Sequence, residues 1–142
     1  MANKSDLLDG LVELLLEELP PVTVQASWLE QLTGLAHALR EVARRHPATF
    51  PQLLQLPAGT PAARRVRAGV HQVLRAAEVA DEHLERLERI LTSAALGLAA
   101  GEVSARFAGH SRRALDEDFR ALAILVEAGI QPFRTGNGES RP

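Results

Sequence analysis

The chain contains no cysteine and no tyrosine, and the first absence excludes disulfide bonds, thiol nucleophiles and cysteine-based metal sites. Aromatic residues make up only 4 % of the sequence, so a core has to be built mainly from aliphatic side chains. There is no basic excess: the formal net charge of −2 argues against a protein that wraps nucleic acid on its own. The apolar stretch 90–101, which contains no charged residue, is too short to cross a bilayer. The first residues lack a signal-peptide pattern, and a cytoplasmic location is expected.

Residue types that carry catalysis are present, but not in the arrangements that catalysis needs. No serine lies in a Gly-x-Ser-x-Gly turn, and there is no glycine-rich phosphate loop. The acidic residues between Asp81 and Glu88 alternate with arginines, which is typical of a solvated helix face. No His-x-x-x-His pair occurs among the histidines, which are His37, His46, His71, His83 and His110. We therefore expect no catalytic residue, no metal and no cofactor.

The length of 142 residues and a hydrophobic content of 46 % fit one globular domain. Glycines and prolines gather between apolar runs with helical spacing, which predicts an all-α fold. The domain is expected to extend over 1–134, and the polar tail 135–142 is expected to be disordered. Six helices are predicted, at 3–19, 27–46, 49–56, 61–77, 81–108 and 116–128.

Capping signals support these boundaries. Ser27 with Glu30 has the spacing of a capping box, as does Asn3 with Asp6. The pair Thr60-Pro61 combines an N-cap residue with proline at the first helical position. No glycine or proline separates the fourth helix from the fifth, for which Asp81 is the best N-cap candidate and Gly109 a plausible C-terminal stop.

The segment 3–13, with a polar residue, a lysine and a Leu-Leu pair, and the segment 28–47, which ends in His-Pro, resemble the C-terminal part of TetR-family transcriptional regulators. From Asn3 to Glu13, a polar residue, a lysine and a Leu-Leu pair resemble the start of the helix that joins the family's DNA-binding and regulatory domains. The stretch from Trp28 resembles the family's next helix, which commonly ends in His-Pro as at His46-Pro47. The order of the later helices also matches, so the resemblance extends to about Phe133. It implies a repressor-type regulator that binds a small effector and forms homodimers.

The chain departs from this family at its start. A helix-turn-helix domain needs about three helices upstream, and only two residues precede Asn3. The expectation is a regulator that lacks its DNA-reading domain, with DNA as a partner only if the native protein has such a domain. A truncated chain, a misassigned gene start and a natural fragment remain open as explanations.

In the family, the ligand cavity lies between the helices that correspond here to the second to fifth. For each candidate, the alternative is an ordinary core position. His71 would orient a ligand, or be partly exposed; Arg75 would pair with an acidic ligand group, or point into solvent. The effector is expected to be apolar or amphipathic. The candidate lining residues are Trp28, Leu32, Leu35, Phe50, Leu53, His71, Leu74, Arg75, Leu91 and Ala95.

The stretch 90–101 is apolar nearly all round, so it must be covered on every side. Pairing of the last two helices with their twofold mates in a four-helix bundle would cover it, and the resemblance implies the same interface. The alternative is a central helix buried within the monomer. The predicted interface residues are Ala94, Gly97, Leu98, Gly101, Phe119, Leu122 and Val126.

Two other functions remain open. One is a ligand-free protein–protein interaction or dimerisation module, and the less favoured one is a small helical enzyme whose site the sequence does not reveal. A solid core across the second to fifth helices would contradict the sensor hypothesis.

Overall fold

The computed structural model describes residues 4–19, 26–55 and 59–136. Within these residues the chain forms α-helices and short 3₁₀ helices, and its only β-pairing is an isolated bridge between Val79 and Arg134. The all-α prediction is confirmed. The elements are α1 (Lys4–Glu17), α2 (Trp28–Arg45), η1 (Phe50–Gln55), α3 (Pro61–Ala76), α4 (Asp81–Val103), η2 (Ala105–Phe107), α5 (Arg112–Gly129) and η3 (Gln131–Phe133).

Two of the predicted helix starts are present as capping structures. At α2, the Ser27 hydroxyl accepts from the Glu30 backbone N–H at 3.2 Å, and the Glu30 carboxylate accepts from the Ser27 N–H at 3.1 Å. At α3, the Thr60 hydroxyl accepts from the Ala63 N–H at 3.3 Å. The other expected box involves Asn3, which lies outside the described residues.

The boundary between α3 and α4 is made without glycine or proline. Glu78 adopts the left-handed conformation with φ of 66°, and the Val79 N–H then returns to the Leu74 carbonyl at 3.0 Å. The N-cap of α4 is Ala80, not the predicted Asp81, and it has no side-chain cap. Its N–H instead donates to the Phe133 carbonyl at 2.9 Å, so docking of η3 sets where α4 begins.

The predicted fifth helix is too long at its C-terminal end. It was expected to reach Ala108, but α4 ends at Val103 because the chain turns back there and the Phe107 ring packs against Gly101. Gly109 lies in the next turn with φ of 93°. α5 then begins at Arg112, capped by Ser111, four residues before the predicted start at Asp116.

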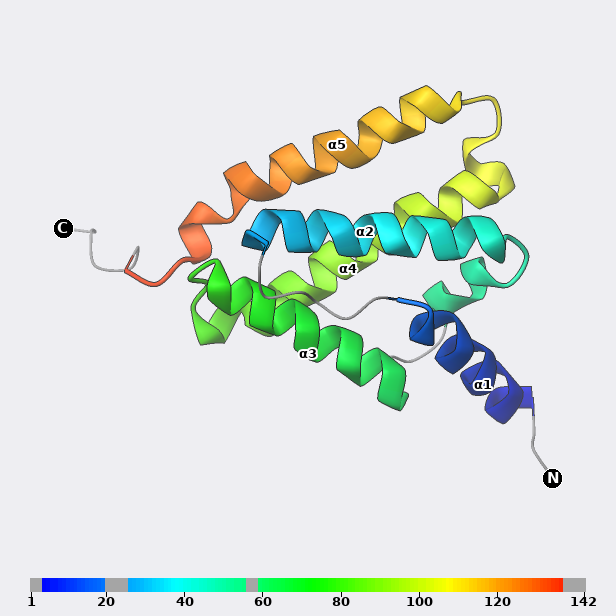
Figure 1. The fold of residues 1–142 in the computed structure, drawn as a ribbon, viewed down its shortest axis with the longest axis horizontal. Coiled ribbons are helices and arrows are strands. Elements are labelled where there is room, and N and C mark those ends of the chain that lie inside the picture. Colours follow the sequence, from blue (N-terminus) through cyan, green and yellow to red (C-terminus); the bar gives the residue numbers. More distant parts are fainter. Residues whose placement is uncertain (1–3, 20–25, 56–58, 137–142) are drawn as a thin grey trace.

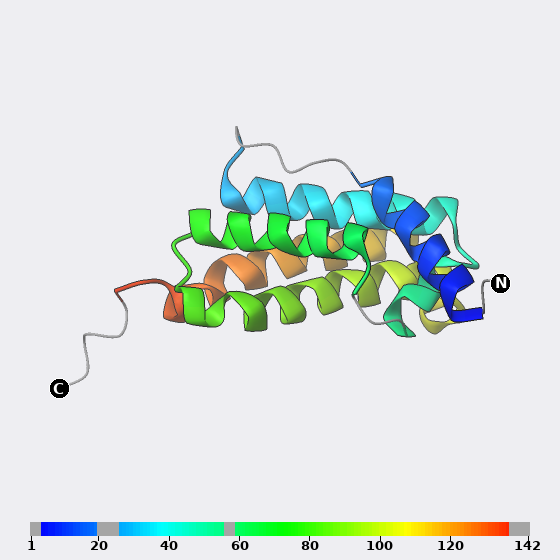
Figure 2. The ribbon, with the colours of Figure 1, turned by 90° about the horizontal axis from the view of Figure 1, so that it is seen from below.

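α2 lies at the centre of the bundle, where it packs against α3, α4 and α5 (Figure 1). α4 runs behind it and also contacts α3 and α5, while α1 crosses the bundle at one end and packs on α3 (Figure 2). The first residue of the predicted polar tail, Thr135, is held by a hydrogen bond, since its N–H donates to the Glu78 carbonyl at 2.8 Å. Residues 137–142 of this tail lie outside the described residues.

The buried side chains form two clusters. The first joins α1, α2, η1, α4 and α5, with Phe50 and Val42 at its centre. The second joins the end of α3, the start of α4 and η3, with Leu74 and Val70 at its centre. No helix among the described residues is apolar enough over sufficient length to cross a membrane.

Candidate functional site

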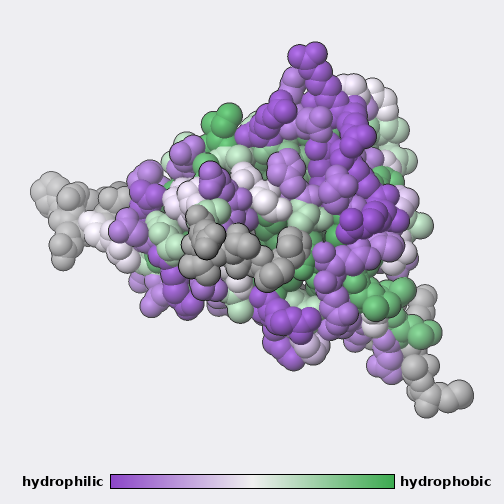
Figure 3. Space-filling model, in the orientation of Figure 1, coloured by the Kyte–Doolittle hydropathy of each residue, from purple (hydrophilic) through white to green (hydrophobic). Residues whose placement is uncertain are grey.

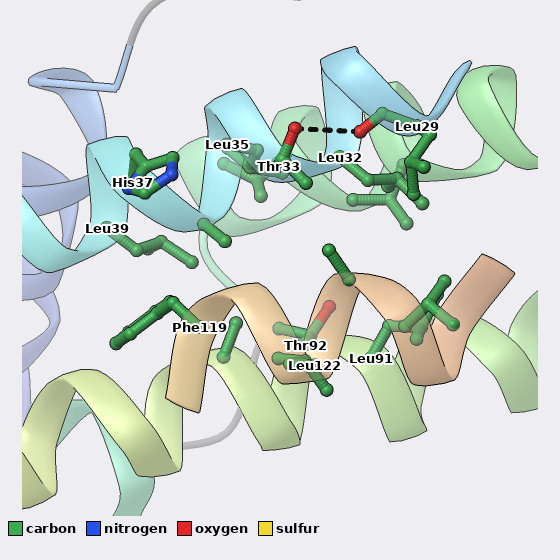
Figure 4. A pocket seen from close by; sticks show the side chains of 16 residues that line it. Leu29, Leu32, Thr33, Leu35, His37, Leu39, Leu91, Thr92, Phe119 and Leu122 are labelled. Carbon is green, nitrogen blue, oxygen red and sulfur yellow. Dashed lines mark hydrogen bonds between the residues drawn. The ribbon is translucent and has the colours of Figure 1, made fainter. Parts of the chain in front are cut away.

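A cavity of about 70 Å³ lies where the two clusters meet, between α2, α3, α4 and α5 (Figure 4). Leu39, Ala95 and Phe119 reach it from the first cluster, and Leu32, Leu91 and Val70 from the second. The lining residues are Leu29, Leu32, Thr33, Leu35, Ala36, His37 and Leu39 on α2; Val66 and Val70 on α3; Leu91, Thr92 and Ala95 on α4; and Phe119, Leu122, Ala123 and Val126 on α5.

Helical periodicity explains why these residues converge. On α5 the lining positions 119, 122, 123 and 126 recur every three or four residues, which places them on one face of the helix. On α2 the lining positions span a wider arc, because 35, 36 and 37 all contribute. Apart from Thr33, His37 and Thr92, every described lining side chain is apolar. The site is therefore suited to enclosing an apolar body, with polar contacts only at a few fixed points.

Phe119 closes one end of the cavity, and Arg40 holds it there. The Arg40 guanidinium lies 4.8 Å from the centre of the Phe119 ring, within range of a cation–π interaction. The ring of His37 also stacks on Phe119, with centroids 6.3 Å apart. The end wall is therefore fixed by contacts from α2 to α5.

Arg40 also belongs to an ion-pair network, which we call the arginine anchor: Arg40, Arg44, Glu102 and Asp116. The Arg40 side chain is 4 % exposed, and it donates to Glu102 and to Asp116, each at 2.5 Å. Arg44 donates to Glu102 at 2.8 Å. Because these residues come from α2, α4 and α5, the arginine anchor ties three helices together beside the cavity.

The two carboxylates of the arginine anchor are stabilised in their charged form. Burial opposes ionisation of Glu102, but hydrogen bonds from Arg40 and Arg44 outweigh it, so the pKa of Glu102 is lowered. The hydrogen bond from Arg40 is the main reason that the pKa of Asp116 is lowered. Within the described residues, no cluster of three potential metal ligands occurs.

Four of the ten predicted ligand-lining residues do line the cavity: Leu32, Leu35, Leu91 and Ala95. The other apolar candidates are placed in the core. Phe50 and Leu74 are completely buried, because each lies inside one of the two clusters. Leu53 and Trp28 pack on the outside of these clusters.

The two polar candidates are also outside the cavity lining. His71 faces inward from α3, and its Nε2 atom is buried without a hydrogen-bond partner among the described residues. Arg75 is exposed, with its Nε atom 3.5 Å from the Asp81 carboxylate. Neither side chain is in position to contact a ligand in this cavity.

Some residues predicted for the dimer interface point inward instead. Phe119, Leu122 and Val126 line the cavity from α5. Gly101 is covered by the Phe107 ring of its own chain. An amphipathic face shows that a helix is covered on one side, but not what covers it, which is why the sequence assigned these residues to a partner.

The remaining predicted interface residues lie on a half-buried stripe of α4. Gly97 borders open space, since a Cβ atom there would meet nothing within 4 Å, and Ala94 and Leu98 are half-buried. Three further apolar side chains of α4 and α5 were not predicted for the interface and are exposed: Ile90, Ile124 and Leu125, with 56 %, 67 % and 68 % of their surface exposed. Ile124 and Leu125 lie in the apolar run 121–126 and Ile90 precedes Leu91, so the sequence pattern does not show which of these side chains stay exposed.

A second, wider cavity of about 520 Å³ adjoins the first on the side of α1 and α3. Leu35 and Val66 line both cavities and therefore form the wall between them. Leu16 and Glu17 of α1 also line the second cavity. The apolar cavity is thus separated from α1 by two aliphatic side chains.

Comparison with known proteins identifies the family. A family model described as tetracyclin repressor-like, C-terminal domain, matches residues 32–125, which is well over half of the chain. The chain therefore belongs to the TetR-family regulators and corresponds to their C-terminal domain. Among the curated proteins, none matches the sequence significantly.

A solved structure supports the same assignment at the level of the fold. The crystal structure of the Streptomyces coelicolor TetR family protein ActR in complex with actinorhodin superposes with a TM-score of 0.75 and 18 % sequence identity. The match covers 96 % of this chain and 78 % of that chain. At this identity the similarity establishes a shared fold.

Proposed function

We propose that this chain is the sensor and dimerisation part of a repressor-type TetR-family transcriptional regulator, and that it binds a small apolar or amphipathic effector. The apolar cavity between α2, α3, α4 and α5 carries this proposal. The similar fold of ActR, whose structure contains actinorhodin, supports a ligand site in such a domain. The function is binding, and we assign it no chemical step.

The cavity has to widen when the effector enters. Its volume of about 70 Å³ is well below the roughly 300–1,000 Å³ of typical ligand sites. The second half of α5 is the element best placed to move, since it covers the cavity with Leu122, Ala123 and Val126 and no ion pair of the arginine anchor reaches it. Opening there would enlarge the site without breaking the ion pairs.

Movement at the cavity can reach α1 through α3. α3 supplies Val66 and Val70 to the cavity wall. At its start, the Ala62 N–H donates to the Glu13 carboxylate of α1 at 2.7 Å. A shift of α3 would therefore move α1, and a helix-turn-helix domain joined to α1 would change its position relative to a second copy.

We also propose that the chain forms a homodimer through α4 and α5. Ile90, Ile124 and Leu125 are exposed on these helices, and Gly97 allows another helix to approach closely. A four-helix bundle with the same helices of a second copy would bury all three side chains.

Binding of 4-ethylanisole, an uncharged ring compound, tests the sensor function. Titration calorimetry on the full chain should show saturable binding of one molecule per chain. Ala123→Leu, which adds a side chain inside the cavity, should abolish this binding, whereas the same change at exposed Ala76 should not. Equal binding by both variants would contradict the assignment to this cavity.

Sedimentation velocity at micromolar concentration tests the dimer. We expect a dimer for the unchanged chain and a monomer for Ile124→Glu combined with Leu125→Glu. Leu54→Glu is a matched control, since Leu54 is also an exposed leucine but lies on η1. A monomeric unchanged chain would overturn the proposed interface.

A second function is favoured by one observation on α1. Leu7, Leu11 and Leu14 are exposed there, and apolar surface gathers over α1 (Figure 3). A protein–protein interaction module without a ligand would use such a face. Loss of self-association on Leu11→Glu combined with Leu14→Glu, together with no binding of 4-ethylanisole, would support this function in place of the sensor.

A further inference from the structure

Each of the two hydroxyl groups in the cavity wall already uses its proton in a hydrogen bond within the chain. The Thr33 hydroxyl donates to the Leu29 carbonyl at 2.9 Å, and the Thr92 hydroxyl donates to the Glu88 carboxylate at 3.3 Å. They reach the cavity from α2 and α4, on opposite sides of it (Figure 4). A hydroxyl has one proton and two lone pairs, so each oxygen remains available to accept a hydrogen bond from a ligand.

The electrostatic surroundings disfavour a negative charge in the cavity. No described lining residue is an arginine or lysine. The guanidinium of Arg40, which packs on the lining residue Phe119, is bound to Glu102 and Asp116, and the Nε atom of Arg67 lies 3.9 Å from Glu88. An anion inside would lose its hydration and meet no arginine or lysine side chain among the described lining residues.

Glu88 adds to this effect from behind the cavity wall. It is 7 % exposed and lies one hydroxyl group away from the cavity, since Thr92 both lines the cavity and donates to it. Two negative charges repel each other more strongly across a buried, weakly polar region than in water. The wall therefore presents hydrogen-bond acceptors backed by a carboxylate.

We propose that the cavity selects an uncharged, largely apolar effector carrying a hydrogen-bond donor such as a phenolic hydroxyl, and that it rejects carboxylates and other anions. The hydroxyl oxygen of Thr33 or Thr92 would accept the hydrogen bond from this donor. The inference rests on the ligand-binding function proposed above, and it adds the chemical class of the effector to that function.

Three probes with the same ethylbenzene body test the selectivity at pH 7. 4-Ethylphenol carries a donor, 4-ethylanisole replaces it with a methyl ether, and 4-ethylbenzoate is an anion. We expect titration calorimetry on the full chain to give an affinity for the phenol about three- to tenfold higher than for the anisole, the usual value of one net hydrogen bond. The benzoate should bind at least about tenfold more weakly than the anisole, because its charge is not compensated.

Variants of the two threonines assign the preference to their hydroxyls. A phenol has one proton to donate, so each single variant, Thr33→Val or Thr92→Val, leaves the other acceptor in place. The double variant should lower the affinity for the phenol to that for the anisole and leave the affinity for the anisole unchanged. Thr92→Ser keeps the hydroxyl and should retain the preference. Thermal unfolding followed by circular dichroism checks the fold. If the variants with Thr92→Val unfold because Glu88 loses a partner, Thr33→Val carries the test, and an unchanged preference in it would overturn the role of Thr33.

The outcomes separate this inference from the function on which it rests. Equal affinities for phenol and anisole, or tightest binding of the benzoate, would overturn the donor selectivity while leaving a ligand site in place. A preference that persists in the double valine variant would overturn the assignment to Thr33 and Thr92. Failure of all three probes to bind would overturn the sensor function, and this inference with it.

Discussion

The two halves of α5 are held in opposite ways. In the first half Leu115 and Phe119 are buried and Asp116 is ion-paired to Arg40, so this part is fixed to α2 and α4. In the second half the inward residues border a cavity, and the outward residues Ile124 and Leu125 are exposed. The first half of α5 is thus fixed by packing and an ion pair, whereas the second half borders the cavity on its inner face and solvent on its outer face. This difference locates where the domain can yield to a ligand and where it cannot.

Removal of the central charge of the arginine anchor should have the largest effect. Arg40→Leu leaves Glu102, which is 10 % exposed, without its main partner. We expect a loss of about 3–5 kcal/mol in the free energy of unfolding, as for other buried ion pairs that lose one member. Urea unfolding followed by circular dichroism measures it.

The matched control for this change is on the exposed side of the same half of α5. Arg113→Leu removes a pair with Glu117 at 3.5 Å in which both side chains are exposed. It should cost less than about 1 kcal/mol. Similar losses from the two variants would show that the first half of α5 is not held by the arginine anchor.

A smaller loss is expected from Gly101→Ala, at the end of α4 beside the arginine anchor. A Cβ atom at this position would overlap the ring of Phe107, so the ring has to move out of its site. We expect a destabilisation of about 1–3 kcal/mol in urea unfolding, typical of overpacking.

Gly34→Ala is the control, since Gly34 lies on an exposed part of α2 where a Cβ atom meets nothing within 4 Å. Alanine should stabilise this helix by up to about 1 kcal/mol. If both substitutions stabilise the chain, the packing of Phe107 on Gly101 contributes nothing to the fixed end.

The helices themselves could largely be predicted, because their signals are local. The capping box of Ser27 and Glu30 and the pair Thr60-Pro61 marked two helix starts within one residue. The end of α4 could not be predicted, because it depends on Phe107 folding back onto Gly101. The turn at Glu78 carried no signal either, since a glutamate in the left-handed region is uncommon.

The cavity was predictable only in part, for a related reason. Leu32 and Leu35 belong to a clear apolar stripe of α2, and the stripe correctly marks their inward face. The contribution of Phe119 depends on how α5 packs, which periodicity does not show. The partners of Arg40 are 62 and 76 residues away in the sequence, so no local pattern could join them.

The second half of α5, which borders the cavity, should accept a larger side chain with little loss of stability. Ala123→Leu places extra carbon atoms in the cavity, and we expect the free energy of unfolding to change by less than about 1.5 kcal/mol. The affinity for 4-ethylanisole should fall at least about tenfold, equivalent to about 1.4 kcal/mol. Urea unfolding and calorimetry on the same preparation give both values. A loss of stability as large as that of Arg40→Leu would show that this half is packed as tightly as the first.

Acid should weaken the fixed half selectively, with the smallest effect of the series. Hydrogen bonds from the arginines lower the pKa values of Glu102 and Asp116 in the folded chain below their ordinary values of 4.5 and 3.8. A lowered folded pKa contributes stability that is fully present above the unfolded pKa and is lost as the pH falls through the folded pKa. The urea midpoint should therefore decrease below about pH 4.5, and Glu102→Gln should flatten this decrease, whereas Glu117→Gln on the exposed face of α5 should not. An equal flattening by both variants would mean that acid acts on the surface charge as a whole, and the contrast between the two halves of α5 would then rest on packing alone.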